Sequence, residues 1–310
     1  MVSEAFKEVL TSTREWAQSA GLLDDEFNLE ALRSAMSASI LPVPETAKIS
    51  KVDAGVVPSE WICEFETHPD HRLLYLHGGG YTAGGLDSHR PLAAWISKAS
   101  GCSVLLADYR LAPEHPFPAA VDDALTAFRW MHANGPSGKG RATHTFIAGD
   151  SAGGGLTLAA LLALRDAGDQ LPHATVTLSA YTDLAHTGES MKSRLDVDPV
   201  CNPRTMPEMA ATYLAGTDPK TPLASPLYAD PRGLPPLLMQ VGDAEVLLDD
   251  TTRYAEKAKS AGVEVTLEVW PEMFHVWQSL APLFPEAQQA VDQIGQFIRR
   301  FCSGSEVSGK

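Results

Sequence analysis

The chain has 310 residues, 44% of them hydrophobic, which is enough for one large α/β domain or two small ones with a sizeable core. Its 24 basic and 39 acidic residues leave a formal net charge of −15, and phosphate backbones repel such a surface, so nucleic acid is excluded as a predicted partner. No signal-peptide pattern and no run of about 18 apolar residues occur, so we expect a cytoplasmic protein with no membrane span.

The N-terminal segment is predicted to be helical. Apolar residues recur there at three- and four-residue spacing, and the prolines of the segment 41–45 then end the helical pattern. Two short strands are expected next, at 47–55 and 59–67, with a turn at Gly55–Pro58 between them. This part of the chain therefore predicts a hairpin that precedes the main sheet.

From residue 71 onwards, strand and helix candidates alternate along the chain. The expected strands lie at 71–77, 102–109, 144–150, 174–181, 235–242 and 263–270. The expected helices lie near 90–100, 119–133, 152–167, 250–261 and 284–301. Continuously apolar strands are typical of a sheet covered on both faces, so the alternation predicts an α/β fold with an open, mostly parallel sheet. Residues 183–234 hold no clear strand and are interpreted as an insertion.

A serine stands where an apolar strand gives way to a helix. Gly149, Asp150, Ser151, Ala152 and Gly153 fit the pattern G-x-S-x-G, in which a tight strand-to-helix turn exposes the serine hydroxyl. Glycine is needed because a side chain would collide with the turn, and the following helix points its N-terminal amides at the site. The alternative is a serine that only caps the helix, beside glycines that only permit packing.

Three consecutive glycines follow the first core strand. They are expected to form a loop whose amide hydrogens converge on one point, as an oxyanion hole requires. We assign Gly79 and Gly80 as donors from this loop and the N–H of Ala152 as the donor from the other side, and we expect His77 and His89 to order the loop by hydrogen bonding. A phosphate-binding loop is the weaker alternative, because there is no Walker lysine and no G-x-G-x-x-G that opens a helix.

The serine hydroxyl also needs a base and an acid that orients the base. His275 lies in a loop after the last strand, and a doubly wound sheet gathers functional groups at the carboxyl ends of its strands. After the penultimate strand, Asp243 and Glu245 compete for the role of the acid. Asp249 and Asp250 are interpreted as caps of the next helix.

The four cysteines are scattered along the chain, at Cys63, Cys102, Cys201 and Cys302. Two of them lie in predicted strands, where a cysteine is usually a small buried side chain. Reduced, structural thiols are therefore favoured over a disulfide or a catalytic role. No Cys or His cluster has metal-ligand spacing, so no metal is expected.

Taken together, these motifs resemble the hormone-sensitive-lipase-like family of α/β-hydrolases, the bacterial esterases with HGGG and GDSAGG motifs. His77-Gly78-Gly79-Gly80, the GDSAGG hexapeptide that starts at Gly149, and residues 108–120 stand in the family's order. The likeness spans about residues 50 to 300. It implies an α/β-hydrolase fold and a carboxylesterase that cleaves short- to medium-chain acyl esters with water through an acyl-enzyme intermediate, without a cofactor.

The resemblance also bears on the choice of the acid. The commoner family motif D-P-L-x-D, aligned on EVLLD at 245–249, places Glu245 at the acid position and leaves Asp243 two residues too early. The implied triad is therefore Ser151, His275 and Glu245, with His77, Gly78 and Asp150 as supporting motif residues. The chain is similar, too, to monoterpene lactone hydrolases, so a cyclic ester is the alternative substrate. A non-catalytic receptor is a further alternative, although all three triad residue types are present.

A helical cap over the sheet is the last feature that the resemblance implies. We divide the chain into an N-terminal cap segment (1–45), a catalytic domain in two parts (46–182 and 235–303), a cap insertion (183–234) and a disordered tail (304–310). Residues of the substrate pocket are expected among aromatic and methionine side chains, namely Tyr81, Tyr181, Met206, Tyr213 and Trp277. Members of this branch often dimerise, so the resemblance leaves a homodimer open.

Overall fold

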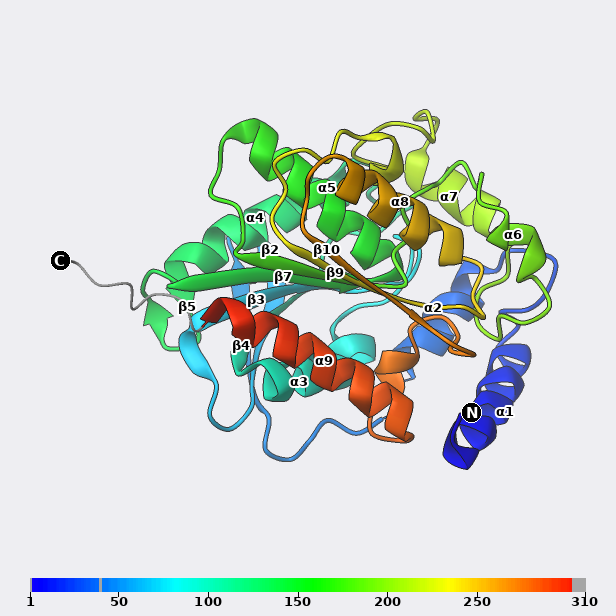
Figure 1. The fold of residues 1–310 in the computed structure, drawn as a ribbon, viewed down its shortest axis with the longest axis horizontal. Helices are drawn as coiled ribbons and strands as arrows, with labels where there is room; N and C mark the ends of the chain where they lie inside the picture. Colours follow the sequence, from blue (N-terminus) through cyan, green and yellow to red (C-terminus); the bar gives the residue numbers. More distant parts are fainter. Residues whose placement is uncertain (1, 39–40, 303–310) are drawn as a thin grey trace.

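The computed structural model describes residues 2–38 and 41–302 and places eight strands in one sheet between two layers of helices (Figure 1). The strands of this sheet are β1 (Lys48–Ala54), β2 (Val57–Cys63), β3 (His68–Leu76), β4 (Cys102–Ala107), β7 (His144–Asp150), β8 (Ala174–Leu178), β9 (Leu237–Gly242) and β10 (Val265–Trp270). The strands β5 (Asn134–Gly135) and β6 (Gly138–Lys139) form a separate ribbon.

The helices are α1 (Glu4–Ser19), α2 (Leu29–Ser37), α3 (Leu86–Ser100), α4 (Ala119–Ala133), α5 (Ser151–Ala167), α6 (Ser190–Ser193), α7 (Met206–Leu214), α8 (Leu248–Ser260) and α9 (Pro285–Cys302). Two short 3₁₀ helices, η1 (Pro226–Tyr228) and η2 (Trp277–Leu280), complete the described elements. The predicted disordered tail at 304–310 lies outside the described residues.

The predicted α/β fold is confirmed. The strand order is β1-β2-β4-β3-β7-β8-β9-β10, and every neighbouring pair from β4 to β10 is parallel. The strands β4 and β7 are buried along their whole length, which is why their sequences are continuously apolar instead of alternating. All carboxyl ends of these parallel strands therefore meet at one edge of the sheet.

The hairpin at the start of the sheet has a shorter turn than we predicted. β1 and β2 pair antiparallel with Ala54 opposite Val57, so the turn consists of Gly55 and Val56, and Pro58 lies inside β2. A proline is tolerated there because β2 begins to pair with β4 only at Ser59, so the missing N–H interrupts no bond between these two strands.

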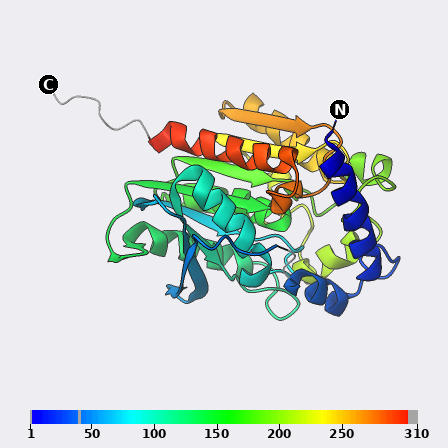
Figure 2. The same cartoon turned by 90° about the horizontal axis from the view of Figure 1, so that it is seen from below.

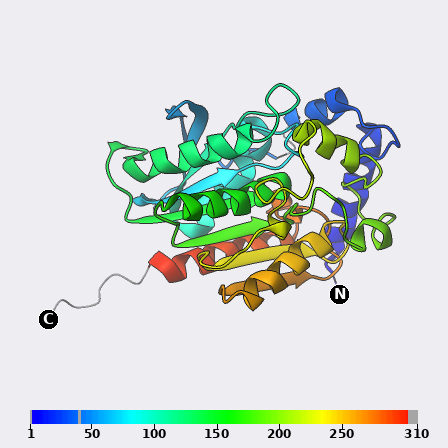
Figure 3. The ribbon, with the colours of Figure 1, turned by 90° about the horizontal axis from the view of Figure 1, so that it is seen from above.

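The two faces of the sheet carry separate hydrophobic cores. Helices α3 and α9 cover one face (Figure 2), and α4, α5 and α8 cover the other (Figure 3). Because side chains alternate along a strand, Leu73 and Tyr75 of β3 belong to the first core, while Leu74 and Leu76 belong to the second. We refer to these cores as the α3/α9 core and the α4/α5 core.

The N-terminal helices lie at the end of the sheet together with α6 and α7 (Figures 1 and 3). The chain breaks between α1 and α2, where Gly21 has a φ of 72° and the side chain of Asn28 caps α2 by accepting from the N–H of Ala31 at 2.9 Å. The buried ring of Phe6 anchors α1, since its centroid lies 6.1 Å from that of Phe274.

The described residues of the segment 183–234 hold no strand, as the sequence predicted. This segment contacts the N-terminal segment directly, because the side chain of Asn202 donates to the carbonyl of Asp24 at 2.6 Å and Arg204 pairs with Asp25 at 3.0 Å. The two predicted cap segments thus pack together, while their boundaries stay a prediction.

Two carboxylates of α8 fix the start of the same segment. Asp250 accepts hydrogen bonds from the N–H groups of Thr182 and Asp183, each at 2.8 Å, and Asp249 accepts from the N–H of Ser190 at 3.0 Å. Neither side chain caps its own helix. The prediction that Asp249 and Asp250 are helix caps is therefore wrong, because backbone donors brought close by the tertiary fold take their oxygens.

Four imidazoles gather at the amino ends of the strands. The ring centroids of His68 and His71 lie 4.2 Å apart, those of His71 and His144 lie 4.6 Å apart, and those of His144 and His173 lie 4.9 Å apart. Burial, and after it the charges of the three neighbouring histidines, lower the pKa of His71 to about 4, although Asp70 opposes the shift. The folded chain therefore resists protonation of this ring.

We predict that His71→Gln reduces the loss of stability in acid. Between about pH 6.5 and 4 the unfolded chain binds a proton at His71 that the folded chain does not, so acidification through this window favours unfolding. The melting temperature of the variant should fall less than that of the wild type between pH 7.5 and 4.5. His115→Gln, at an exposed position outside the cluster, is the control and should behave as wild type. An unchanged pH dependence of His71→Gln would contradict this role.

Candidate active site

Polar side chains from five segments meet at the carboxyl edge of the parallel strands. His77 follows β3, Ser151 follows β7, Ser179 follows β8, Glu245 follows β9 and His275 follows β10. Because every parallel strand of the sheet ends at this edge, residues far apart in sequence come within reach of one another.

Ser151 lies on a strained turn between β7 and α5. Its φ is 51°, in the left-handed region that a residue with a side chain rarely adopts. The flanking glycines make the turn possible, because a Cβ atom at Gly149 would overlap the carbonyl oxygen of Gly153, and one at Gly153 would overlap that of Leu76. This explains the crowding of small residues around the serine by backbone contact, as the sequence predicted.

The side chain of Asp150 fastens this turn to the glycine loop. It is buried, and its Oδ1 accepts from the hydroxyl of Tyr75 at 2.8 Å and from the N–H of Gly78 at 3.2 Å. His89 lies within reach of the same N–H, with its Nε2 at 3.2 Å from the nitrogen of Gly78. The turn after β7 and the loop after β3 therefore share one hydrogen-bond network.

His77 occupies the base of the glycine loop. Its ring stacks on Tyr109 with centroids 4.2 Å apart, the Tyr109 hydroxyl donates to its carbonyl oxygen at 2.6 Å, and its Nδ1 lies 2.8 Å from the carbonyl oxygen of Gly78. Burial lowers the pKa of His77 to about 3, so the ring is neutral near pH 7. These contacts hold the loop at the carboxyl end of β3.

Gly79 and Gly80 have φ values of 118° and 62°, which favour glycine. Within the described part of the chain, neither backbone N–H donates to another protein group. Ala152 is the second residue of α5, so its N–H has no partner four residues earlier in the helix. Three backbone donors thus remain near Ser151.

Glu245 and His275 form a buried pair. The Nδ1 of His275 lies 2.8 Å from one carboxylate oxygen of Glu245, and the other oxygen accepts from the N–H of Gly242 at 2.7 Å and from the hydroxyl of Ser179 at 2.8 Å. The Ser179 hydroxyl also accepts from the N–H of Val276 at 3.1 Å, which fixes the loop that carries the imidazole. Sequence reasoning missed Ser179, although its place directly after β8 marks the same edge of the sheet.

Asp243, the competing acid, faces away from this pair. Its carboxylate accepts from the N–H of Glu272 at 2.6 Å, and its carbonyl oxygen accepts from the guanidinium of Arg194 at 2.7 Å. The structure therefore brings Glu245, and not Asp243, to the imidazole of His275.

Cys201 is a second neighbour of His275 that sequence reasoning did not find. The buried carboxylate of Asp198 accepts from the N–H groups of Val200 and Cys201 at 2.9 and 3.0 Å and from that of Val246 at 3.0 Å, so it clamps this loop beside Glu245. Burial raises the pKa of Cys201 to about 11 and that of Asp198 to about 6.

The pKa of His275 is raised, although burial of the ring by itself would lower it. The hydrogen bond with the Glu245 carboxylate and the negative charge of that carboxylate act against burial, and the pKa is raised well above its ordinary value. A carboxylate that contacts the imidazole stabilises the imidazolium, so this arrangement favours transfer of a proton to His275.

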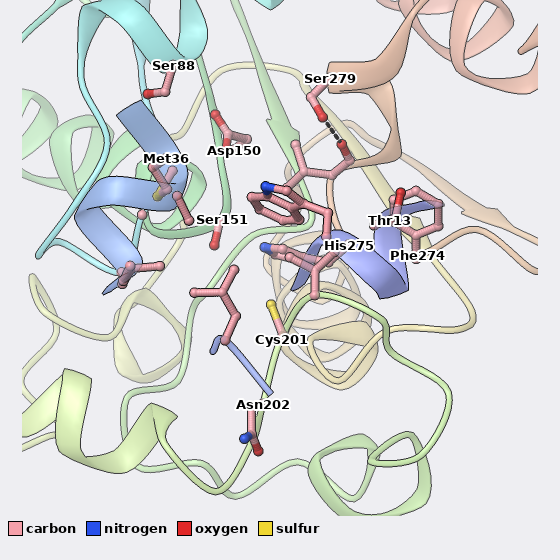
Figure 4. A pocket seen from close by; sticks show the side chains of 18 of the residues that line it. Thr13, Met36, Ser88, Asp150, Ser151, Cys201, Asn202, Phe274, His275 and Ser279 are labelled. Carbon is pink, nitrogen blue, oxygen red and sulfur yellow. Dashed lines mark hydrogen bonds between the residues drawn. The ribbon is translucent and has the colours of Figure 1, made fainter. Parts of the chain in front are cut away.

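A pocket of about 690 Å³ opens onto these groups (Figure 4). Ser151, His275 and Cys201 line it together. Much of the remaining wall is apolar and comes from α1, α2, the connection between them and the segment after α2, through Val9, Trp16, Leu22, Phe27, Leu32, Met36 and Leu41. The pocket is of a size typical of small-molecule sites.

The predicted pocket residues divide into two groups. Tyr181 and Met206 line the pocket. Tyr81, Tyr213 and Trp277 do not: Tyr81 and Tyr213 stack on each other with centroids 3.9 Å apart, and Trp277 is fully buried beside Trp270. These three predictions are therefore wrong, because packing inside the cores takes up the three aromatic rings.

Over residues 2–38 and 41–302, no group of three His, Cys, Asp or Glu side chains is arranged to hold a metal ion. In the same part of the chain, every helix is too short or too polar to cross a membrane.

Comparison with known proteins gives a consistent result. Residues 73–279 match the alpha/beta hydrolase fold family. The chain is 48% identical over 249 residues to an acetyl-hydrolase of Streptomyces hygroscopicus, which covers 80% of this chain and 81% of that protein. Among solved structures, it resembles EstE5 soaked in ethyl alcohol, with a TM-score of 0.91, 40% identity and coverage of 97% of this chain and 100% of that one. It also resembles an esterase from the bacterial hormone-sensitive lipase family, with a TM-score of 0.87, 42% identity and coverage of 97% and 99%.

Proposed function

Because this chain belongs to the alpha/beta hydrolase family and is a carboxylic ester hydrolase, we propose that it cleaves its substrates through an acyl-serine intermediate formed on Ser151. The observation that carries this proposal is the 2.8 Å contact between Glu245 and His275 at the wall of the pocket that Ser151 also lines. An oriented imidazole that lines the same pocket as a half-buried serine is the arrangement that turns a hydroxyl into a nucleophile.

In the first step, the hydroxyl oxygen of Ser151 attacks the ester carbonyl. The Nε2 of His275 takes the hydroxyl proton, and negative charge develops on the carbonyl oxygen. The unpaired N–H groups of Gly79, Gly80 and Ala152 support an assignment as the donors to this oxygen, and such donors are worth about 3–4 kcal/mol each in related sites.

His275 then protonates the leaving alcohol, which gives the acyl-serine. In the second step, a water molecule attacks the acyl-serine with His275 again as the base, the bond to the Ser151 oxygen breaks, the carboxylic acid leaves, and His275 returns the proton to Ser151. Glu245 keeps Nδ1 of the imidazole protonated and directed, so that Nε2 faces the reacting atoms. The donors on the second oxygen of Glu245, from Gly242 and Ser179, hold the carboxylate in place throughout.

The size and lining of the pocket limit the length of the acyl chain that can bind. Its volume of about 690 Å³ and its apolar wall fit an ester with a short to medium acyl chain. Two methionines contribute to this wall. Met36 comes from α2 of the N-terminal segment, and Met206 comes from α7 of the segment 183–234. We therefore propose that α1, α2 and α7 set the chain length that the enzyme accepts.

Ser151→Ala should lower kcat for p-nitrophenyl butyrate by roughly 10⁴–10⁶-fold, because it removes the attacking oxygen. Circular dichroism and the melting temperature should stay close to those of the wild type, since Ser151 is only half-buried and lines the pocket. Wild-type turnover by a folded Ser151→Ala protein would exclude the mechanism.

Glu245→Gln should reduce kcat by roughly 10²–10⁴-fold, because a neutral amide no longer stabilises the imidazolium of His275. The matched change Asp243→Asn, two residues earlier, should leave kcat within about threefold, since this carboxylate contacts the backbone of Glu272 instead. Steady-state kinetics of both variants decide which carboxylate is the acid of the triad. Loss of activity in Asp243→Asn alone would assign this role to Asp243 instead of Glu245.

Across p-nitrophenyl esters of increasing acyl length, kcat/KM should be highest for chains of up to about eight carbons and low for palmitate. Met36→Trp, which narrows the pocket from α2, should move the optimum to shorter chains. The same assay with a lactone tests the cyclic-ester alternative. A maximum at palmitate, or an optimum that Met36→Trp leaves in place, would contradict the assigned acyl site.

A further inference from the structure

The cysteines of this chain separate by the face of the sheet on which they lie. Cys63 ends β2 and packs against the α4/α5 core, whereas Cys102 begins β4 and belongs to the α3/α9 core. Cys302 ends α9 and packs against the α3/α9 core as well. Cys201 lines the pocket. Two of the four free thiols, Cys102 and Cys302, therefore share one face of the sheet.

Both thiols lie in the corner where the guanidinium of Arg299, near the end of α9, donates to the carbonyl of Ala99, near the end of α3. Their mutual interaction is the largest influence on both: the pKa of Cys102 is raised well above its usual range and the pKa of Cys302 is lowered, which the positive charge of Arg299 also favours. Cys102 is fully buried, while Cys302 is half-buried at the helix end. The pair thus combines one accessible, more acidic thiol with one protected thiol behind it.

The backbone on both sides of the pair is held in place. The carbonyl of Cys102 accepts from the hydroxyl of Ser97 at 2.9 Å, and its N–H donates to the hydroxyl of Ser100 at 3.2 Å. On the helix side, Gly295 lies so close to the carbonyl of Ala99 that a Cβ atom would overlap it. The end of α3, the start of β4 and the last turns of α9 therefore form one packed corner.

From this juxtaposition, we propose that Cys102 and Cys302 close to a disulfide when the protein meets a two-electron oxidant of the peroxide class. The Cys302 thiolate attacks one oxygen of hydrogen peroxide, the O–O bond breaks, and a sulfenic acid and hydroxide form. The thiol of Cys102 then attacks the Cys302 sulfur, the S–S bond forms, and the hydroxyl leaves. In total, two thiols and one peroxide give one disulfide and two water molecules.

The disulfide between Cys102 and Cys302 would raise the stability of the fold and would not change the rate of ester hydrolysis. It joins the amino end of β4 to the end of α9, whereas Ser151 lies at the carboxyl edge of the sheet. The loop that this disulfide closes runs from Cys102 to Cys302 and contains most of the chain, so the disulfide removes conformational freedom from the unfolded state. Cys201, the thiol beside His275, has its pKa raised to about 11 and stays protonated and slow to react.

The test treats the reduced, full-length protein with a small excess of hydrogen peroxide. We expect the loss of two titratable thiols, a linked pair of peptides that contain Cys102 and Cys302 in non-reducing peptide mapping, and a melting temperature higher by about 5 °C. Dithiothreitol should reverse all three changes, and the rate of ester hydrolysis at 25 °C should stay unchanged.

Two cysteine variants test the disulfide independently of the proposed mechanism of ester hydrolysis. Cys302→Ser, at a half-buried position, should show no linked peptides and no peroxide-dependent rise in melting temperature. Cys63→Ser, which removes a thiol on the other face of the sheet, should respond as wild type. A linkage between other cysteines, or oxidation of Cys302 to a sulfinic acid without linkage to Cys102, would overturn the proposal whatever the esterase assay shows.

Discussion

A buried carboxylate must be fully hydrogen-bonded, and for Glu245 this requirement organises the carboxyl edge of the sheet. Withdrawal of an ionised carboxylate from water costs several kcal/mol unless donors replace the solvent. Here the replacement comes from the imidazole of His275, the N–H of Gly242 and the hydroxyl of Ser179, which lie at or just beyond the carboxyl ends of β10, β9 and β8. The same contacts that satisfy the acid therefore fix the imidazole, so the geometry that stabilises the fold is also the geometry that the proposed mechanism needs.

A second constraint, the tight backbone turn between β7 and α5, places Ser151 at the pocket that His275 also lines. Ser151 holds a left-handed backbone conformation that costs of order 1–3 kcal/mol, and it persists because β3 packs tightly against the turn at Gly153 while Asp150 ties the turn to Gly78. The turn that carries Ser151 and the glycine loop after β3 are thus joined by a direct hydrogen bond. The helical segments that line the pocket are held to the rest of the chain by side-chain contacts, such as those of Arg33 on α2 with the carbonyl of Thr82 and the carboxylate of Glu114.

The parts of the fold that follow from local pattern could be predicted from the sequence. Continuous apolar runs located β4 and β7, and the small residues beside Ser151 indicated the turn. Contacts between distant segments could not be predicted, because no local pattern encodes them: the carboxylates of Asp249 and Asp250 bind another loop, and the Ser179 hydroxyl bridges two others. For the same reason, buried aromatic rings such as Trp277 could not be separated by sequence from rings that line a pocket.

The central claim is that the convergence of these segments gives Ser151 a reactivity that no other serine of the chain has. Reaction with a fluorophosphonate, followed by mass spectrometry of the digested protein, tests it most directly, since only an activated hydroxyl displaces the fluoride. The account predicts one adduct per chain, located on Ser151, and loss of esterase activity in proportion to labelling. Full ester hydrolysis with Ser151 unlabelled, or an adduct at another residue that alone accounts for the lost activity, would contradict it.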